Sequence, residues 1–189
     1  MCLLITLFQI VPGAPLMVAA NRDERLDRPA VAATVLRERE PRILGGRDLL
    51  AGGTWLAVSD AGVVAGLTNQ PTADGRDPAK RSRGELPLIC ASQRTAKQAV
   101  DALTAGVDPV RYNPCWMLVG DRDELFAVGI GPGGPAPEIE QLGPGIHVLE
   151  NAPLRAVAPK AAFVRELVEQ RLAGEPGAGA AVVDRKSVV

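Results

Sequence analysis

The spacing of apolar runs and turns constrains the fold of this chain more than any other feature of its sequence. Residues 2–10 are apolar at all but two positions, and a Pro-Gly turn separates them from a second apolar run at 16–20. Two further runs, at 55–58 and 63–67, flank an Asp-Ala-Gly turn. Apolar runs joined by tight turns are typical of β-hairpins, so each pair predicts one.

Helical patterns follow in the middle of the chain and near its end. Thr95 is a suitable N-cap for a helix at 96–104, and Gly106 is expected just past the end of that helix. A shorter helix is expected at 85–92. Pro159 begins a third helix that runs to about Leu172. The apolar stripe of this last helix consists of Val164, Leu167, Val168 and Leu172.

Strand patterns resume between the second and third helices. They lie at 116–119, 125–130, 138–142 and 146–150. Short turns favour antiparallel pairing, and the order of strands, helices, strands and helix predicts an α+β fold with two mainly antiparallel sheets packed beneath helices. A chain of 189 residues is expected to form one domain, here at 1–173. The Gly/Ala-rich tail at 174–189 is expected to be poorly ordered or to form a terminal strand.

Composition and charge argue against several classes of function. The net charge of −1 and the lack of a basic run with interleaved aromatics give no footprint for nucleic acid. The basic cluster at 76–83 is interpreted as a solvated loop rather than a binding patch. Three cysteines without a Cys-x-x-Cys spacing indicate no metal centre and a reduced, cytoplasmic compartment. No apolar stretch reaches the roughly 18 residues that a membrane span needs.

Cys2 directly follows Met1, and this position has two interpretations. Removal of Met1 would place a thiol and a free α-amine on the same residue. The α-amine has an ordinary pKa of about 7.7–8.0, so it can accept the thiol proton and make Cys2 a nucleophile. In the alternative interpretation, Cys2 is simply a small residue after the start codon.

Polar residues follow three of the predicted strands. They occupy positions 21–24, 68–69 and 150–151. Such residues commonly form turns. In a nucleophile site they would have specific tasks: Asp23 would hold the terminal ammonium, and the neutral amides of Asn69 and Asn151 would donate hydrogen bonds to a developing oxyanion.

Six short motifs carry a family resemblance. They are Met-Cys at 1–2, Ala-Asn-Arg-Asp-Glu at 20–24, Leu-Gly-Gly-Arg-Asp at 44–48, Gly-Gly-Thr-Trp-Leu at 52–56, Leu-Thr-Asn-Gln at 67–70 and Ser-Arg-Gly-Glu-Leu at 82–86. In this order they resemble the NRDE-motif family, whose eukaryotic members are called transport and Golgi organization protein 2. That family in turn is similar to N-terminal nucleophile hydrolases of the choloylglycine/penicillin V acylase type.

The resemblance implies a four-layer αββα sandwich and a set of site residues. Cys2 would be the nucleophile and Asp23 would orient it. Asn69 and Asn151 would contact the oxyanion and the substrate. The neighbouring Asn21, Arg22 and Trp55 are expected to help bind the substrate. Two of these roles have alternatives: Arg22 either pairs with Glu24 at the surface or holds the active-site loop, and Trp55 belongs either to the core or to a substrate-stacking surface.

The sequence departs from the family pattern at two informative places. The family usually has a Ser before the later Asn, whereas this chain has Glu150 and so places a carboxylate beside a presumed oxyanion donor. Relatives also continue with further strands after the last predicted helix, so the fold is expected to be shortened at its C-terminal end.

These observations leave three functional hypotheses. The first is an N-terminal-cysteine amidase or acyltransferase that acts on a small acyl amide or thioester and requires no cofactor. The second is a non-catalytic carrier for haem or lipid on the same scaffold, with haem as cargo and Cys2 or His147 as its axial ligand. The third is a scaffold that only binds partners, and a homo-oligomer is compatible with each of them.

Overall fold

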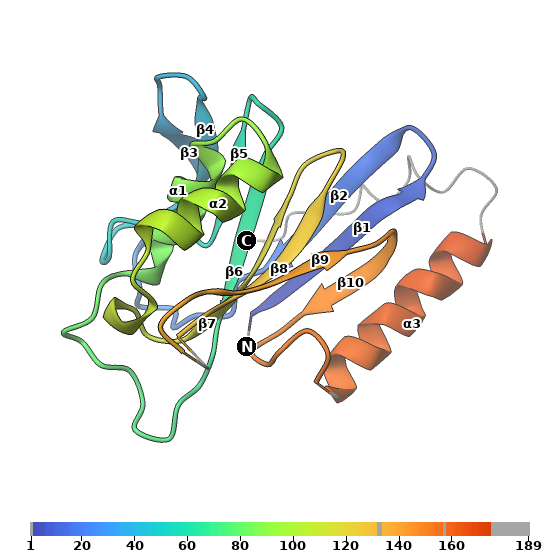
Figure 1. Cartoon of the computed structure of the whole chain (residues 1–189). Coiled ribbons are helices and arrows are strands. Elements are labelled where there is room, and N and C mark those ends of the chain that lie inside the picture. Colours follow the sequence, from blue (N-terminus) through green and yellow to red (C-terminus); the bar gives the residue numbers. More distant parts are fainter. Residues whose placement is uncertain (1, 132–133, 157, 175–189) are drawn as a thin grey trace.

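Two antiparallel sheets lie face to face in the computed structural model, which describes residues 2–131, 134–156 and 158–174 (Figure 1). Among these residues, the smaller sheet has the order β10 (Gly145–Leu149), β1 (Leu3–Val11) and β2 (Ala14–Asn21). The larger sheet follows chain order: β3 (Ala30–Arg37), β4 (Ile43–Asp48), β5 (Leu56–Ser59), β6 (Val64–Asn69), β7 (Cys115–Gly120), β8 (Leu125–Ile130) and β9 (Glu138–Leu142).

Helices cover the outer face of each sheet (Figure 1). The larger sheet is covered by α1 (Leu86–Ala91) and α2 (Ala96–Gly106), and the smaller sheet by α3 (Pro159–Gly174). Two short 3-10 turns, η1 (Arg83–Glu85) and η2 (Pro109–Arg111), flank the first two helices. The predicted four-layer αββα sandwich is therefore confirmed. In the described part of the chain, none of the helices has both the length and the hydrophobicity needed to cross a membrane.

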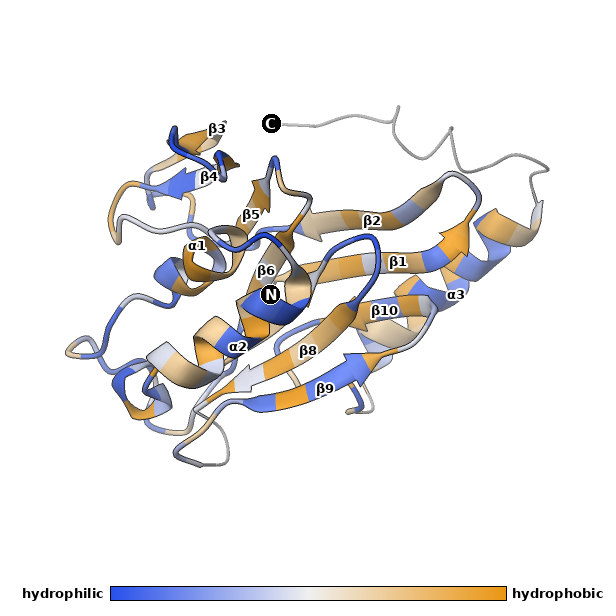
Figure 2. Cartoon of the chain, turned by 45° about the horizontal axis from the view of Figure 1, so that its top comes forward, coloured by the Kyte–Doolittle hydropathy of each residue, from blue (hydrophilic) through white to orange (hydrophobic). Residues whose placement is uncertain are grey.

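Apolar side chains line each of the three spaces between the layers. Leu103 and Met117 are among those between α1, α2 and the larger sheet. Leu4 and Leu118 join the two sheets, and Val148 packs beneath α3. Figure 2 shows β1 and β10 as largely hydrophobic, in contrast to the alternating β9. The difference follows from position, because a strand buried on both faces needs apolar side chains on both.

The first predicted hairpin is confirmed and brings the NRDE segment to Cys2. β1 and β2 pair antiparallel, with Leu3 opposite Asn21. Residues 21–24 therefore begin beside the start of β1. The two sheets also approach closely here, since a Cβ on Gly66 of β6 would lie 2.8 Å from a methyl carbon of Leu4. Glycine at this position lets the end of β6 come near Cys2.

The predicted helices are present, with changes at their ends. Thr95 caps α2, accepting a hydrogen bond from the backbone N of Gln98 at 3.1 Å. Gly106 is part of the last helical turn and not the residue after it, and α3 extends to Gly174. Leu167 is 45% exposed, so the predicted apolar stripe of α3 is wrong at this position. The predicted tail beyond Gly174 lies outside the described residues.

Two strands were not predicted from the sequence. β3 is rich in alanine and exposed along its first half, and its pairing with β4 has two register shifts. β4 contains two glycines. β4 has neither the alternation nor the continuous apolar run that identifies a strand. β3 has a largely apolar run at 30–36, but alanine, which is depleted in strands, makes up much of it. Both segments are strands because they pair within the larger sheet.

Candidate active site

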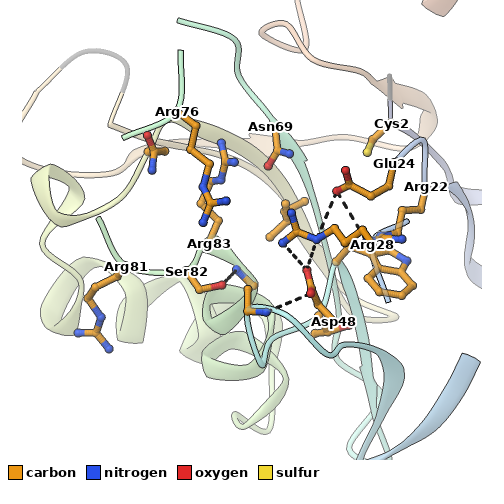
Figure 3. A pocket seen from close by; sticks show the side chains of 16 residues that line it. Cys2, Arg22, Glu24, Arg28, Asp48, Asn69, Arg76, Arg81, Ser82 and Arg83 are labelled. Atoms are coloured by element: carbon orange, nitrogen blue, oxygen red, sulfur yellow. Dashed lines mark hydrogen bonds and ion pairs between the residues drawn. The ribbon is translucent and has the colours of Figure 1, made fainter. Parts of the chain in front are cut away.

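A pocket of about 320 Å³ opens where the start of β1 meets the end of β6. Its lining comes from the NRDE segment, the glycine-rich segments and the loop after β6 (Figure 3). The lining residues are Cys2, Arg22, Glu24, Arg28, Asp48, Ala51, Thr54, Trp55, Leu67, Asn69, Arg76, Arg81, Ser82, Arg83, Gly84 and Asn113. Four of the residues predicted for the site, Cys2, Arg22, Trp55 and Asn69, are among them.

Cys2 and Asp23 lie next to each other. The Cys2 Sγ is 3.9 Å from the backbone O of Asp23. The chain's amino terminus lowers the pKa of the Asp23 carboxyl below its ordinary 3.8, mainly by hydrogen bonding and then by its positive charge, and Lys160 at the start of α3 adds to this. The amino group of the full chain belongs to Met1, so the role predicted for Asp23, to orient the α-amine of Cys2, stays a prediction.

Asn69 and Asn151 are brought together, although only Asn69 lines the pocket. Asn69 is the last residue of β6. Asn151 follows β10, and its Nδ2 donates a hydrogen bond to the backbone O of Asn69 at 2.5 Å. Figure 3 shows the side-chain amide of Asn69 in the pocket on the side of the thiol. Asn151 supports the end of β6, which carries Asn69.

Arg22 lines the pocket and contacts both Trp55 and Glu24. Its guanidinium stacks on the ring of Trp55 at 4.6 Å, and its Nη2 lies 3.6 Å from Glu24. Glu24 also faces Arg28 at 3.6 Å, and Arg28 pairs with Asp48 at 2.7 Å. This chain of alternating charges runs along one wall of the pocket. Trp55 lines the pocket with Arg22 stacked on its ring, and its stacking on a substrate stays a prediction. Asn21 is exposed on β2 and does not line the pocket.

The glycines of the family motifs are explained by close packing around this pocket. A Cβ on Gly46 would lie 2.3 Å from the Trp55 ring. A Cβ on Gly53 would lie 2.4 Å from the backbone of Gly84, and the Thr54 N donates to the Gly84 O at 2.9 Å. Glycine is needed where backbones and rings approach this closely. The motifs thereby hold Trp55 and the Ser-Arg-Gly segment against the pocket.

The arginines of the loop after β6 were missed as site residues. Arg76, Arg81 and Arg83 all line the pocket, although Arg76 and Arg81 are exposed, as expected for a solvated loop. The basic composition of the cluster was a signal. Its position could not be derived, because it depends on long-range contacts, including paired hydrogen bonds of 2.8 Å between Asn113 and the backbone of Asp77.

Glu150 does not point its carboxylate at the pocket. The side chain is 8% exposed, and its Oε1 accepts a hydrogen bond at 3.1 Å from the backbone N of Ala161 in the first turn of α3. Its backbone O accepts another from Thr68 Oγ1 at 2.6 Å. The unusual carboxylate beside Asn151 is thus used to attach α3.

The remaining thiols and the histidine do not line the pocket, although Cys115 lies opposite Asn69 in the larger sheet. Cys90 and Cys115 are buried, and burial raises the pKa of each thiol to about 12. His147 is half-buried on β10, with its Nε2 2.9 Å from the Gly143 O, and burial lowers its pKa. Within the described residues, no group of three or more His, Cys, Asp and Glu side chains is arranged to hold a metal ion. Cys2 is therefore the thiol best placed for chemistry.

Comparison with solved structures defines the class of fold. The structure is similar to the N-acylethanolamine-hydrolyzing acid amidase ortholog of Caenorhabditis elegans, with a TM-score of 0.62 over 98% of this chain and 87% of that one at 13% identity. The mutant C2A conjugated bile acid hydrolase from Clostridium perfringens gives a TM-score of 0.54 over 89% of this chain and 58% of that one at 11% identity. The fold is that of the N-terminal nucleophile hydrolases.

Sequence comparison defines the family. Residues 1–184 match the pattern of Transport and Golgi organisation 2, so the chain belongs to that family. It is 31% identical to the Transport and Golgi organization 2 homolog of Mus musculus over 163 residues and 32% identical to the Homo sapiens homolog over 165. Each alignment covers 80% of this chain and 56% of the relative. The chain thus spans little more than half the length of these relatives.

Proposed function

We propose that this protein is an N-terminal-cysteine amidase or acyltransferase that acts on a small acyl amide or thioester. The observation that carries the proposal is the position of Cys2, which lines the pocket together with Asn69 and lies beside Asp23. A nucleophile, an orienting carboxylate and a neutral amide donor are the groups that acyl transfer requires.

The proposed reaction begins once Met1 has been removed. The α-amine of Cys2 takes the thiol proton, and Sγ attacks the acyl carbonyl carbon, which moves the carbonyl electron pair onto oxygen. The side-chain amide of Asn69 stabilises this oxyanion, and Asp23 balances the ammonium charge. Collapse breaks the bond to the leaving amine or thiolate, which takes up the proton, and leaves an acyl-thioester on Cys2. Water or another nucleophile then releases the acyl group.

Substitution of Cys2 tests this proposal. Cys2→Ser keeps a weaker nucleophile and Cys2→Ala keeps none, so hydrolysis of acyl-amide and acyl-thioester panels should fall by about 100-fold or more. Cys90→Ala is the matched control, because Cys90 is buried away from the pocket and burial raises its pKa to about 12. Equal turnover by the wild type and Cys2→Ala would refute a role for this thiol.

We also propose a cytoplasmic location, in keeping with three unpaired thiols.

A carrier for haem or lipid is the second candidate, and a separate apolar pocket favours it. This pocket of about 480 Å³ lies between α3 and the β1–β2 hairpin, with Leu7, Met17 and Val168 in its lining. It would take the apolar part of a cargo without using the Cys2 thiol. Titration of haem at micromolar protein should then shift the Soret band, and Val168→Glu should abolish the shift. A titration without a shift excludes haem as the cargo.

A further inference from the structure

The pocket around Cys2 has an excess of positive charge. Five arginines and two carboxylates line it, although the whole chain has a net charge of −1. Both carboxylates are already paired: Glu24 lies 3.6 Å from Arg22 and from Arg28, and Asp48 lies 2.7 Å from Arg28. Concentrated positive charge in a concave site attracts anions. The arginines whose charge is not balanced by Glu24 or Asp48 are therefore available to bind an anionic ligand.

Arg76 and Arg83 are the arginines of this lining that form no ion pair with a carboxylate in the described part of the chain. Arg81 differs, because it lies 2.6 Å from Glu85. Arg83 is partly buried, and its Nη1 donates to the Pro114 O at 3.1 Å. Burial, with the charges of Arg76 and Arg28, lowers the pKa of Arg83. A partly buried guanidinium beside other cations is stabilised when an anion binds.

The fold fixes where these two guanidinium groups lie. The Thr54 N donates to the Gly84 O at 2.9 Å, which attaches the segment that carries Arg83 to another part of the pocket lining. The loop that carries Arg76 is attached by the two hydrogen bonds between Asn113 and Asp77. In Figure 3, Arg76 and Arg83 lie beside each other, with Asn69 between them and Cys2. An anion held by the two arginines would lie in the same pocket as the thiol.

We propose that Arg76 and Arg83 bind an anionic oxygen group, a phosphate or a carboxylate, on the acyl substrate. The inference rests on the proposed function, because the bound anion would position the substrate's carbonyl at Cys2. Guanidinium groups suit this task since they donate parallel hydrogen bonds to two oxygens of one anion. Two unpaired guanidinium groups favour a doubly charged phosphate over a singly charged carboxylate.

Two alkylating reagents of nearly equal size test the proposal on the full chain. Iodoacetate carries a carboxylate and iodoacetamide is neutral, and both form the same S–C bond with loss of iodide. Iodoacetate should label Cys2 at a rate that saturates with reagent concentration, and inorganic phosphate should slow it more than acetate does. Iodoacetamide labelling should not saturate. Peptide mapping would assign the label among the three thiols, of which the other two are buried.

Arginine variants sharpen the result. Arg83→Gln and Arg76→Gln should each slow iodoacetate labelling about tenfold while iodoacetamide labelling changes less than about twofold. Arg76 is exposed, so its replacement should leave the fold intact. Arg76→Gln therefore still tests the anion site if Arg83→Gln proves unstable. The control is Arg94→Gln, which removes an exposed arginine outside the pocket and should change neither rate.

The outcomes separate this proposal from the proposed function. If both reagents label Cys2 but iodoacetate shows no saturation and phosphate gives no protection, the anion site is refuted while the reactive thiol stands. If neither reagent labels Cys2, the proposed function loses its support, and calorimetric titration with inorganic pyrophosphate decides the anion site. Pyrophosphate binding that becomes about tenfold weaker in Arg83→Gln then supports the anion site. If pyrophosphate does not bind, the proposal of an anion site is overturned. Protection by acetate as strong as that by phosphate would assign a carboxylate instead.

Discussion

Trp55 can occupy the pocket wall because Gly46 has no side chain. The Trp55 ring packs on the backbone of Gly46 on one side and supports Arg22 at 4.6 Å. The sequence alone identified Trp55 and Arg22 as candidates but left both roles open. The deciding contact joins β4 to the residue before β5, and single-residue patterns do not encode such contacts.

Gly46→Ala should therefore destabilise the protein by about 1–3 kcal/mol. The new Cβ would lie 2.3 Å from the Trp55 ring, so the ring and the stacked Arg22 must move. Urea unfolding followed by circular dichroism would measure the change. Gly106→Ala is the matched control, because nothing lies within 4 Å of the added methyl and the site is helical. The free energy of unfolding of the control variant should rise by a few tenths of a kcal/mol or more. Equal stability of Gly46→Ala and wild type would contradict this packing.

His147 should make the folded state less stable in mild acid. Burial lowers its folded-state pKa below the ordinary 6.5, so the unfolded chain binds this proton more readily. Its stabilising effect is complete above pH 6.5 and is lost as the pH falls from 6.5 through the folded-state pKa. His147 is the single histidine, so His147→Gln should flatten the dependence of unfolding free energy on pH between about 7 and 5. An unchanged slope in the variant would contradict the assignment.

At the level of elements, the sequence was most informative where its pattern was strong. β8, β9 and the start of α3 were located correctly, because a continuous apolar run marks β8, alternation marks β9 and Pro159 marks the first turn of α3. β3 and β4 were missed because the alanines of β3 and the glycines of β4 weaken the strand pattern, and pairing with neighbours determines both strands. Asn69 was predicted as a site residue from its place at a strand end, but the arginine loop needed tertiary contacts to be located.

Glu150 links two elements, and its removal should loosen α3. Its carboxylate accepts the Ala161 N–H at 3.1 Å near the N-terminus of the helix, where negative charge is favourable. Glu150→Ala should lower stability by about 1–2 kcal/mol and speed hydrogen exchange in α3. Glu166→Ala is the control, because Glu166 is an exposed residue of the same helix. If the two variants exchange at the same rate in α3, the attachment is not through Glu150.

At the scale of the whole molecule, two sheets meet so that the ends of distant strands form one basic pocket with a thiol at its edge. The family resemblance predicted the four-layer architecture correctly, and in it the motif glycines Gly46 and Gly53 lie where a Cβ would clash. The positive charge of the pocket could not be predicted from the net charge of the chain, because net charge does not describe how charges are distributed over the molecule. The prediction of a single domain at 1–173 stands as a prediction.

The most direct test of the account is the mass of the N-terminal peptide after acid quench of a reaction with an acyl thioester. If Cys2 is the nucleophile, the peptide begins at Cys2 and carries the acyl group on its sulfur, and Cys2→Ala forms no such adduct. A peptide that retains Met1 and carries no acyl group would contradict the proposed chemistry, because the α-amine would not be available to accept the thiol proton.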